Sequence, residues 1–286
     1  MNNGGGGALG LGIQETSMAS AIHEVRSADR APRPPSALLA LTELPRALAE
    51  FGSYAALAAP LHATAPRGDG HPVLVLPGFM TSDASTTVLR RFLRRLGYDA
   101  CAWDLGRNLG PRAIGREGEH LVAKLREIHE RTGQKVSLVG WSLGGVMARL
   151  VAGRAPDAVR QVITLGSPFA GSPRATNVWR LYEAMTGQKV DDPHTRGQLR
   201  ELASPPPVPS TAIYSKGDGV VAWENCREPA TASTDNIEVH GSHCGLGVNP
   251  AVLYAVADRL AQPEDAWAPF KRDGLKGFFY PEAGHA

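Results

Sequence analysis

The sequence predicts an α/β protein with a mostly parallel central sheet and helices on both faces of the sheet. Between residues 71 and 260, short apolar runs alternate with longer segments whose apolar residues recur at helical spacing. Continuously apolar runs are typical of strands covered on both faces, and their alternation with helices is typical of parallel sheets. The 286 residues are 43% hydrophobic and 20% charged, as in an ordinary globular protein.

The expected strands and helices follow one another in chain order. At residues 73–76 an uninterrupted apolar run ends at Pro77-Gly78, which predicts the first strand. An amphipathic helix comes next and ends at Gly97, and the last helix has Asn249 as its cap and Pro250 in its first turn. Further strands are expected at residues 99–103, 135–139, 162–165, 211–214 and 237–239, and further helices near residues 121–128 and at 144–152.

The first 66 residues differ from the rest of the chain. Residues 1–35 combine a glycine run with a proline-rich end, and we expect them to form a disordered leader. Residues 36–66 predict a helical segment packed against the main domain, although a peripheral contact with a membrane surface is an alternative. Glu43, Arg46 and Glu50 interrupt its apolar pattern, so it does not indicate a membrane span. Its apolar face comprises Leu41, Leu44, Leu48, Phe51, Ala55 and Ala58.

The composition excludes several classes of protein. A net charge of +2 gives no reason to expect a nucleic-acid partner. The cysteines, Cys101, Cys226 and Cys244, form no CxxC pair and no zinc-like spacing, which argues against a metal site or a disulfide framework. With no secretory signal and no membrane span in the pattern, we expect a cytoplasmic protein, with membrane-peripheral contact as the alternative.

One motif carries a chemical signature. Gly140-Trp141-Ser142-Leu143-Gly144 lies between an expected strand and an expected helix, which is the setting of a GxSxG nucleophile elbow. The tight turn requires small residues on either side of the serine and projects its hydroxyl away from the sheet. We therefore expect Ser142 to be a catalytic nucleophile.

A serine nucleophile needs a general base, and in this arrangement a histidine follows it in the chain. His243 lies in a loop between the last expected strand and the last expected helix. His240 is the nearest rival, but it belongs to the end of the strand. His243 is therefore the expected base.

The histidine in turn needs a carboxylate that fixes its tautomer. Asp218 follows the strand at residues 211–214 and lies between Gly217 and Gly219, which we expect to let the backbone turn sharply. Asp235, Asp191 and Asp192 fit a solvated turn or a polar insertion better. The expected catalytic triad is Ser142, Asp218 and His243.

The oxyanion of a tetrahedral intermediate needs backbone donors. The N–H of Leu143, immediately after the nucleophile, is the first expected donor. The second should come from Pro77-Gly78-Phe79-Met80, with Phe79 as the expected donor and Met80 as its competitor.

At these residues the chain resembles the α/β-hydrolase family, and within it the bacterial lipases and esterases. The resemblance extends from about His71 to Leu260 and includes the elbow, the acid loop at residues 214–218 and the histidine loop at 240–246. It departs at the oxyanion loop, where many such lipases have His-Gly and this chain has Pro77-Gly78. The resemblance implies the α/β-hydrolase fold and a serine carboxylester hydrolase that needs no cofactor.

A long connection of about residues 170–209 separates two expected strands. We expect a small cap insertion over the acyl pocket, with an ordinary packed helix as the alternative. Met80, Trp141, Trp179 and Tyr182 are the expected pocket residues, and they favour an apolar acyl group. The expected hydrolase domain covers residues 67–266, and a C-terminal tail at 267–286 lies over its surface.

The sequence therefore predicts an esterase or lipase that cleaves small-molecule or lipid esters with apolar acyl groups through an acyl-enzyme. An acyltransferase that uses the same triad with an alcohol as acceptor is the alternative, and a non-catalytic binding protein on the same scaffold is a further one. The sequence leaves open the length of the acyl chain, the leaving alcohol and the oligomeric state.

Overall fold

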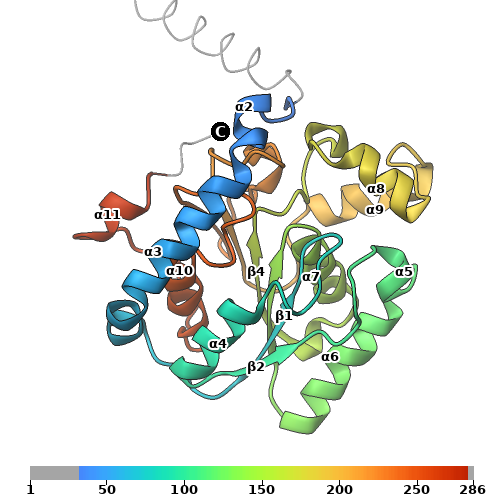
Figure 1. The fold of residues 1–286 in the computed structure, drawn as a ribbon. Coiled ribbons are helices and arrows are strands. Elements are labelled where there is room, and N and C mark those ends of the chain that lie inside the picture. The colour runs from blue at the N-terminus through green and yellow to red at the C-terminus, as the bar shows by residue number, and fades with distance from the viewer. Residues whose placement is uncertain (1–31, 283–286) are drawn as a thin grey trace, which may run out of the picture. The chain divides into compact units, whose positions relative to one another are not determined.

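Residues 32–282 are described in a computed structural model (Figure 1). Their strands form one six-stranded sheet in the order β2-β1-β3-β4-β5-β6. Every pairing within this sheet is parallel, which confirms the predicted fold class. The strands are β1 (Pro72–Leu76), β2 (Asp99–Ala102), β3 (Val136–Trp141), β4 (Val159–Leu165), β5 (Ser210–Tyr214) and β6 (Thr234–Glu238).

Helices cover both faces of the sheet (Figure 1). Side chains alternate along a strand, so Val73 and Val75 of β1 enter one apolar core while Leu74 and Leu76 enter the other. The first core lies under α4 and α10, and the second lies under α6 and α7. The α-helices are α2 (Ala37–Leu41), α3 (Glu43–Thr64), α4 (Thr87–Leu96), α5 (Pro111–Ile114), α6 (Glu119–Thr132), α7 (Leu143–Arg154), α8 (Trp179–Thr186), α9 (Pro193–Ala203), α10 (Pro250–Leu260) and α11 (Lys276–Phe279). Short 3-10 turns are η1 (Pro156–Ala158), η2 (Pro173–Ala175) and η3 (Trp223–Cys226).

The predicted helix ends are confirmed where the sequence signal is local. Gly97 caps α4 in the left-handed conformation, with a φ of 103°. Asn249 caps α10, since its side-chain oxygen accepts a hydrogen bond from the N–H of Ala251 at 2.9 Å, and Pro250 stands in the first turn.

Helix α3 packs against the domain, but most of the apolar residues in its first half face outward. Leu44 is 70% exposed and Leu48 is 71% exposed, whereas Glu43 is buried. The orientation is reversed because loops of the domain offer unpaired backbone N–H groups, and carboxylates satisfy them better than leucines can. Within residues 32–282, no helix has the length and apolar character needed to span a membrane. The expected leader falls almost wholly on residues 1–31, which lie outside the described residues.

Between β4 and β5, the long connection holds α8 and α9, which lie together beside α7 in Figure 1. At the C-terminal end, Phe270 and Tyr280 are both buried, and their rings meet edge to face at 4.7 Å. The Tyr280 hydroxyl donates to the carbonyl of Ala251 in α10 at 2.8 Å. The segment after α10 therefore lies along the surface of the domain.

A buried ion pair joins α7 to the elements around it. The guanidinium of Arg149 contacts the carboxylate of Glu228, and both side chains are almost fully buried. Arg149 also donates to the carbonyls of Leu202 at 2.8 Å and Ser204 at 2.7 Å, and it lies over the ring of Phe169 at 3.8 Å. One side chain thus connects the helix behind the elbow to the end of the α8–α9 connection.

Candidate active site

Ser142 occupies a strained turn between β3 and α7. Its φ is 52° and its ψ is −122°, a conformation that non-glycine residues rarely adopt. Small neighbours make the turn feasible: a Cβ on Gly144 would stand 2.5 Å from the carbonyl oxygen of Leu76, and one on Gly140 would collide with Gly145. The local chain therefore has the geometry that the elbow motif requires.

Asp218 and His243 form a buried hydrogen-bonded pair. Their Oδ2 and Nδ1 atoms are 2.6 Å apart, and both residues are over 90% buried. The other carboxylate oxygen of Asp218 accepts hydrogen bonds from the N–H groups of Val220 at 2.8 Å and Val221 at 2.7 Å. Burial disfavours the imidazolium, but the carboxylates of Asp218 and Glu43 outweigh burial, so the pKa of His243 is raised above its ordinary value.

Two observations place the Asp218–His243 pair close to the elbow. The indole N–H of Trp141, the residue before Ser142, donates to the carbonyl of His243 at 3.1 Å. A Cβ on Gly166, just beyond β4, would lie 3.2 Å from both Asp218 Oδ2 and His243 Nδ1. In the described part of the chain, no hydrogen bond joins the Ser142 hydroxyl to the imidazole. Serine–histidine contacts are often long in unliganded enzymes and tighten when substrate binds.

The rival residues lie elsewhere. His240 is exposed, and Asp235 accepts hydrogen bonds from the backbone of Asn236 and Phe270. Asp191 forms exposed ion pairs with Arg174 and Arg196. None of these groups is bonded to the Asp218–His243 pair.

Backbone hydrogen bonds in the loop at residues 77–80 favour Phe79 over Met80 as the second oxyanion donor. The N–H of Met80 already donates to the carbonyl of Asn108 at 2.8 Å. Asn108 is fully buried, and its side-chain amide also donates to the carbonyl of Pro77 at 2.8 Å. Asn108 therefore bonds this loop at two points. Among the described residues, the N–H groups of Phe79 and Leu143 have no such partner, which leaves both available to a ligand.

A cavity of about 160 Å³ lies beside Ser142 under the α8–α9 connection. Trp179 and Tyr182, two of the four expected pocket residues, line it, and the ring of Tyr182 packs against Phe79 with 5.5 Å between the ring centres. Met80 and Trp141 do not line it: the Trp141 indole N–H donates to the carbonyl of His243, and the backbone N–H of Met80 donates to the carbonyl of Asn108. The other apolar lining residues include Ile114, Leu143, Val146, Met147, Leu150, Val178, Val190, Leu199, Leu202 and Val221.

A second aspartate–histidine–serine arrangement lies at the opposite end of the strands. His71 Nδ1 contacts Asp69, and its Nε2 lies 2.8 Å from the hydroxyl of Ser137. Ser137 is fully buried within β3, and burial lowers the pKa of His71. With no strand-to-helix turn to expose the serine, this arrangement joins β1 to β3 and has no access to a substrate.

Polar residues of α3 also contact the candidate site, a role that was not expected from the sequence. Glu43 accepts hydrogen bonds from the backbone of the acid loop and of the histidine loop, and Glu50 accepts another from Ser242 at 2.7 Å. Their spacing of seven residues on one helical face was the available signal. The backbone turns around Asp218, but neither Gly217 nor Gly219 has a positive φ, so the turn does not require the left-handed conformation that glycine permits. A Cβ on Gly219 would instead collide with the backbone of α2, so this glycine permits close approach of the N-terminal helices.

Cys244 lies next to His243 but is a poor candidate nucleophile. Burial and the nearby carboxylates of Glu43 and Asp218 raise the pKa of its thiol to about 12. All three cysteines are free. No group of three or more His, Cys, Asp or Glu side chains suited to a metal ion occurs within residues 32–282.

Comparison with known proteins places this geometry in context. Residues 71–204 match the family described as "alpha/beta hydrolase fold". A stretch of 56 residues is 45% identical to triacylglycerol lipases of Pseudarthrobacter phenanthrenivorans and Burkholderia plantarii. That stretch is 19% of this chain and spans only 18% and 16% of the two lipases.

Solved structures share the fold at low sequence identity. Lipase B of Aspergillus fumigatus is 20% identical with a TM-score of 0.54, over 70% of this chain and 55% of that one. The mature lipase BlEst2 of Bacillus licheniformis is 20% identical with a TM-score of 0.51, over 70% of this chain and 95% of that one. Together with the parallel sheet, these matches show that the chain has the α/β-hydrolase fold and is similar to lipases and esterases over part of its length.

Proposed function

We propose that this chain is a serine carboxylester hydrolase that cleaves esters with apolar acyl groups through an acyl-enzyme. The observation that carries the proposal is the buried Asp218–His243 pair, with its 2.6 Å hydrogen bond, set next to Ser142 on a strained strand-to-helix turn. Perturbed, buried ionisable groups beside a cavity are typical of catalytic sites. The triacylglycerol lipases that match this chain in part support the same reaction class.

In this mechanism the hydroxyl of Ser142 attacks the ester carbonyl while Nε2 of His243 takes its proton. Asp218 keeps the Nδ1–H oriented and stabilises the imidazolium. The N–H groups of Phe79 and Leu143 donate to the oxyanion of the tetrahedral intermediate. His243 then returns the proton to the departing alcohol, which leaves an acyl group on Ser142. Water, deprotonated by His243, releases the acid in the same manner.

The cavity favours an apolar acyl group. Its lining is mainly aliphatic and aromatic, and its polar side chains are Arg116, Ser142, Thr176, Gln188, Thr195 and Gln198. An acyl chain that enters between α7 and the α8–α9 connection would lose its contact with water and gain roughly 0.8 kcal/mol for each buried methylene. We therefore propose fatty-acyl esters as the substrate class, with water as the acyl acceptor.

Covalent labelling tests the proposed function. A p-nitrophenyl alkylphosphonate should release about one equivalent of p-nitrophenol and modify Ser142 alone, because only an activated serine attacks phosphorus quickly. Peptide mass spectrometry identifies the modified residue. Ser137, which also hydrogen-bonds to a histidine, serves as an internal control and should stay unmodified. Labelling of Ser137 or Cys244 instead of Ser142, or the absence of any labelling, would contradict the proposal.

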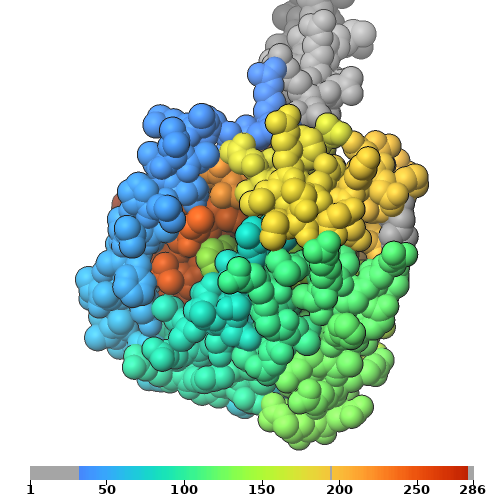
Figure 2. All heavy atoms as spheres, turned by 45° about the vertical axis from the view of Figure 1, so that its right-hand side comes forward, coloured from blue at the N-terminus to red at the C-terminus, as the bar shows by residue number. Residues whose placement is uncertain are grey.

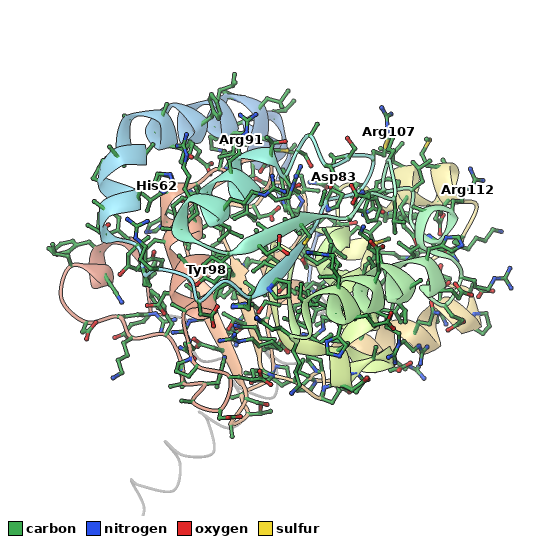
Figure 3. All side chains as sticks on the ribbon, turned by 90° about the horizontal axis from the view of Figure 1, so that it is seen from below. His62, Asp83, Arg91, Tyr98, Arg107 and Arg112 are labelled. Atoms are coloured by element: carbon green, nitrogen blue, oxygen red, sulfur yellow. The ribbon has the colours of Figure 1, made fainter. Side chains whose placement is uncertain are left out.

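We also propose that the exposed stripe of α2 and α3 contacts an anionic lipid surface. Leu38, Leu41, Leu44, Leu48 and Phe51 are each at least half exposed and recur at helical spacing, as in helices that lie flat on membranes. Basic side chains accompany them. Figure 3 shows Arg91 of α4 beside α3, and the charges of Arg95 and Arg67 act on His62 near the end of α3. Apolar residues flanked by arginines complement an anionic bilayer.

Vesicle sedimentation tests this contact. The protein should sediment with vesicles of phosphatidylcholine and phosphatidylglycerol, and less with phosphatidylcholine alone, because the arginines contribute only at a charged surface. Leu44→Ser with Leu48→Ser should weaken binding by roughly 10²-fold, since each leucine loses about 1.5 kcal/mol of burial. Leu181→Ser, which alters an exposed leucine on α8, is the matched control. Unchanged sedimentation of the double variant would refute the lipid assignment. A wild-type protein that is dimeric in solution, together with a monomeric double variant, would also refute it.

A further inference from the structure

Helix α3 contacts the two loops that carry Asp218 and His243. The Oε1 atom of Glu43 accepts hydrogen bonds from the N–H of Gly219 at 2.7 Å and from the N–H of His243 at 3.1 Å. Its Oε2 atom accepts one from the N–H of Cys244 at 2.8 Å. Glu43 is only 5% exposed. One carboxylate thus connects the residue after Asp218 to the backbone of His243 itself.

We propose that Glu43 is a positioning residue of the active site, which sets the distance and orientation of the Asp218–His243 pair by binding the backbones of both loops. The proposal rests on the proposed function, since it assigns a role within the same triad. It concerns a residue outside the region that matches the family, which begins at residue 71. The N-terminal helix is then part of the catalytic apparatus of this chain.

Neighbouring contacts make the support rigid. Arg46 donates to the carbonyl of Gly217 at 2.6 Å and to Glu43 at 2.9 Å, so it holds the acid loop and orients the carboxylate. One turn further along, Glu50 accepts hydrogen bonds from the N–H of Ser242 at 2.7 Å and from the side chain of Asn249 at 3.0 Å. Figure 2 shows the N-terminal helices, in blue, alongside the orange segment that contains these loops. Three side chains of one helix face therefore fix both loops.

Glycines let the helix come this close. A Cβ on Gly245 would collide with the carboxylate of Glu50, and one on Gly241 would stand 3.1 Å from the same group. The absence of side chains at these positions brings backbone N–H groups within hydrogen-bonding distance of α3. Loops that depend on an added helix in this manner lack an equivalent internal support for their N–H groups.

The charge of Glu43 has a separate consequence. The anionic groups that face His243 are Asp218 from the acid loop and Glu43 from α3, and both favour the imidazolium. Arg46 is paired with Glu43, while Glu50 and Cys244 lie beside the same loop. Burial disfavours ionised Glu43, but its backbone hydrogen bonds and the nearby His243 lower its pKa, so it stays anionic at neutral pH. Loss of this charge should therefore lower the pKa of His243.

Kinetics of Glu43→Gln and Glu43→Ala test the proposal, with active enzyme counted by phosphonate titration. Glu43→Gln keeps the shape of the side chain, but its amide NH₂ faces a backbone N–H and cannot accept a hydrogen bond from it. The loss of one hydrogen bond to a charged group should lower kcat about tenfold. Glu43→Ala should lower kcat by about 10²-fold, because the reacting groups are no longer held in register. KM should change little, since Glu43 does not line the cavity.

The pH profile separates positioning from a merely structural role. In the wild type, the acid limb of kcat/KM should lie above the ordinary imidazole value of about 6.5. In Glu43→Gln it should move to lower pH, whereas Glu130→Gln, which removes an exposed charge on α6, should leave both kcat and the limb unchanged. Wild-type kcat and an unshifted acid limb in Glu43→Gln would overturn the inference. Ser142 would still be labelled in that case, so the proposed function would survive.

Discussion

Replacing Ser142 with alanine is expected to lower kcat for a p-nitrophenyl ester by roughly 10⁴- to 10⁶-fold. In the proposed mechanism the hydroxyl oxygen of Ser142 forms the acyl-enzyme. The thiol of Cys244 is a poor substitute, because burial and nearby carboxylates raise its pKa to about 12. The fold should persist, because an alanine Cβ takes the place of the serine Cβ at the same backbone angles. Steady-state kinetics and circular dichroism of the purified variant measure both effects.

Ser137→Ala is the matched control for this substitution. It removes the hydroxyl that lies 2.8 Å from His71, at the end of the strands remote from the cavity. Ester hydrolysis by this variant should stay at the wild-type rate, with a loss of unfolding free energy of about 1 kcal/mol for the missing hydrogen bond. A Ser142→Ala protein that still turns over the ester, or a Ser137→Ala protein that does not, would refute the assignment of the nucleophile.

The largest effect on stability is expected from breaking the Arg149–Glu228 pair. Arg149→Met should lower the free energy of unfolding by about 3–5 kcal/mol, because it leaves the carboxylate of Glu228 buried without its partner. Burial of Arg149 disfavours its charged form and lowers its pKa, and the hydrogen bonds to Leu202 and Ser204 compensate for that cost. Guanidinium unfolding at neutral pH measures the loss.

Two further variants make the stability test specific. Lys135→Met breaks an ion pair with Glu264 whose side chains are each 42% exposed, and it should cost less than about 1 kcal/mol. Arg149→Met combined with Glu228→Leu removes both buried charges and should recover part of the stability lost in the single variant. If Arg149→Met were no more harmful than Lys135→Met, the buried pair would not have the structural role assigned to it.

Local sequence signals predicted most of the fold. The continuous apolar run at β1 and the Gly97 and Asn249 caps depend on neighbouring residues, so periodicity and turn chemistry are enough to place them. The strained turn at Ser142 could be predicted for the same reason, since its glycines stand next to it in the chain. Whether Phe79 or Met80 is free to donate could not, because the answer depends on Asn108, which lies on another loop.

The orientation of α3 was beyond prediction for a different reason. A leucine stripe normally marks the packed face of a helix, and Leu44 and Leu48 follow that pattern. The partners that reverse the orientation, the N–H groups of His243 and Cys244, lie about 200 residues further along the chain. Unpaired backbone donors leave no mark in a sequence, so the preference of this surface for carboxylates becomes evident only in the folded protein.

The position of α3 also implies an order of events during synthesis. This helix is made before the surface that receives it, because the loops around Asp218 and His243 and helix α10 lie much further along the chain. Because earlier segments emerge first and wait for their partners, α3 must remain undocked until these loops have been made. The histidine therefore gains its support from α3 only after the segment around residue 243 has been synthesised. By the proposed mechanism, a chain that stops before that point would have the elbow but no general base, and it would not hydrolyse esters.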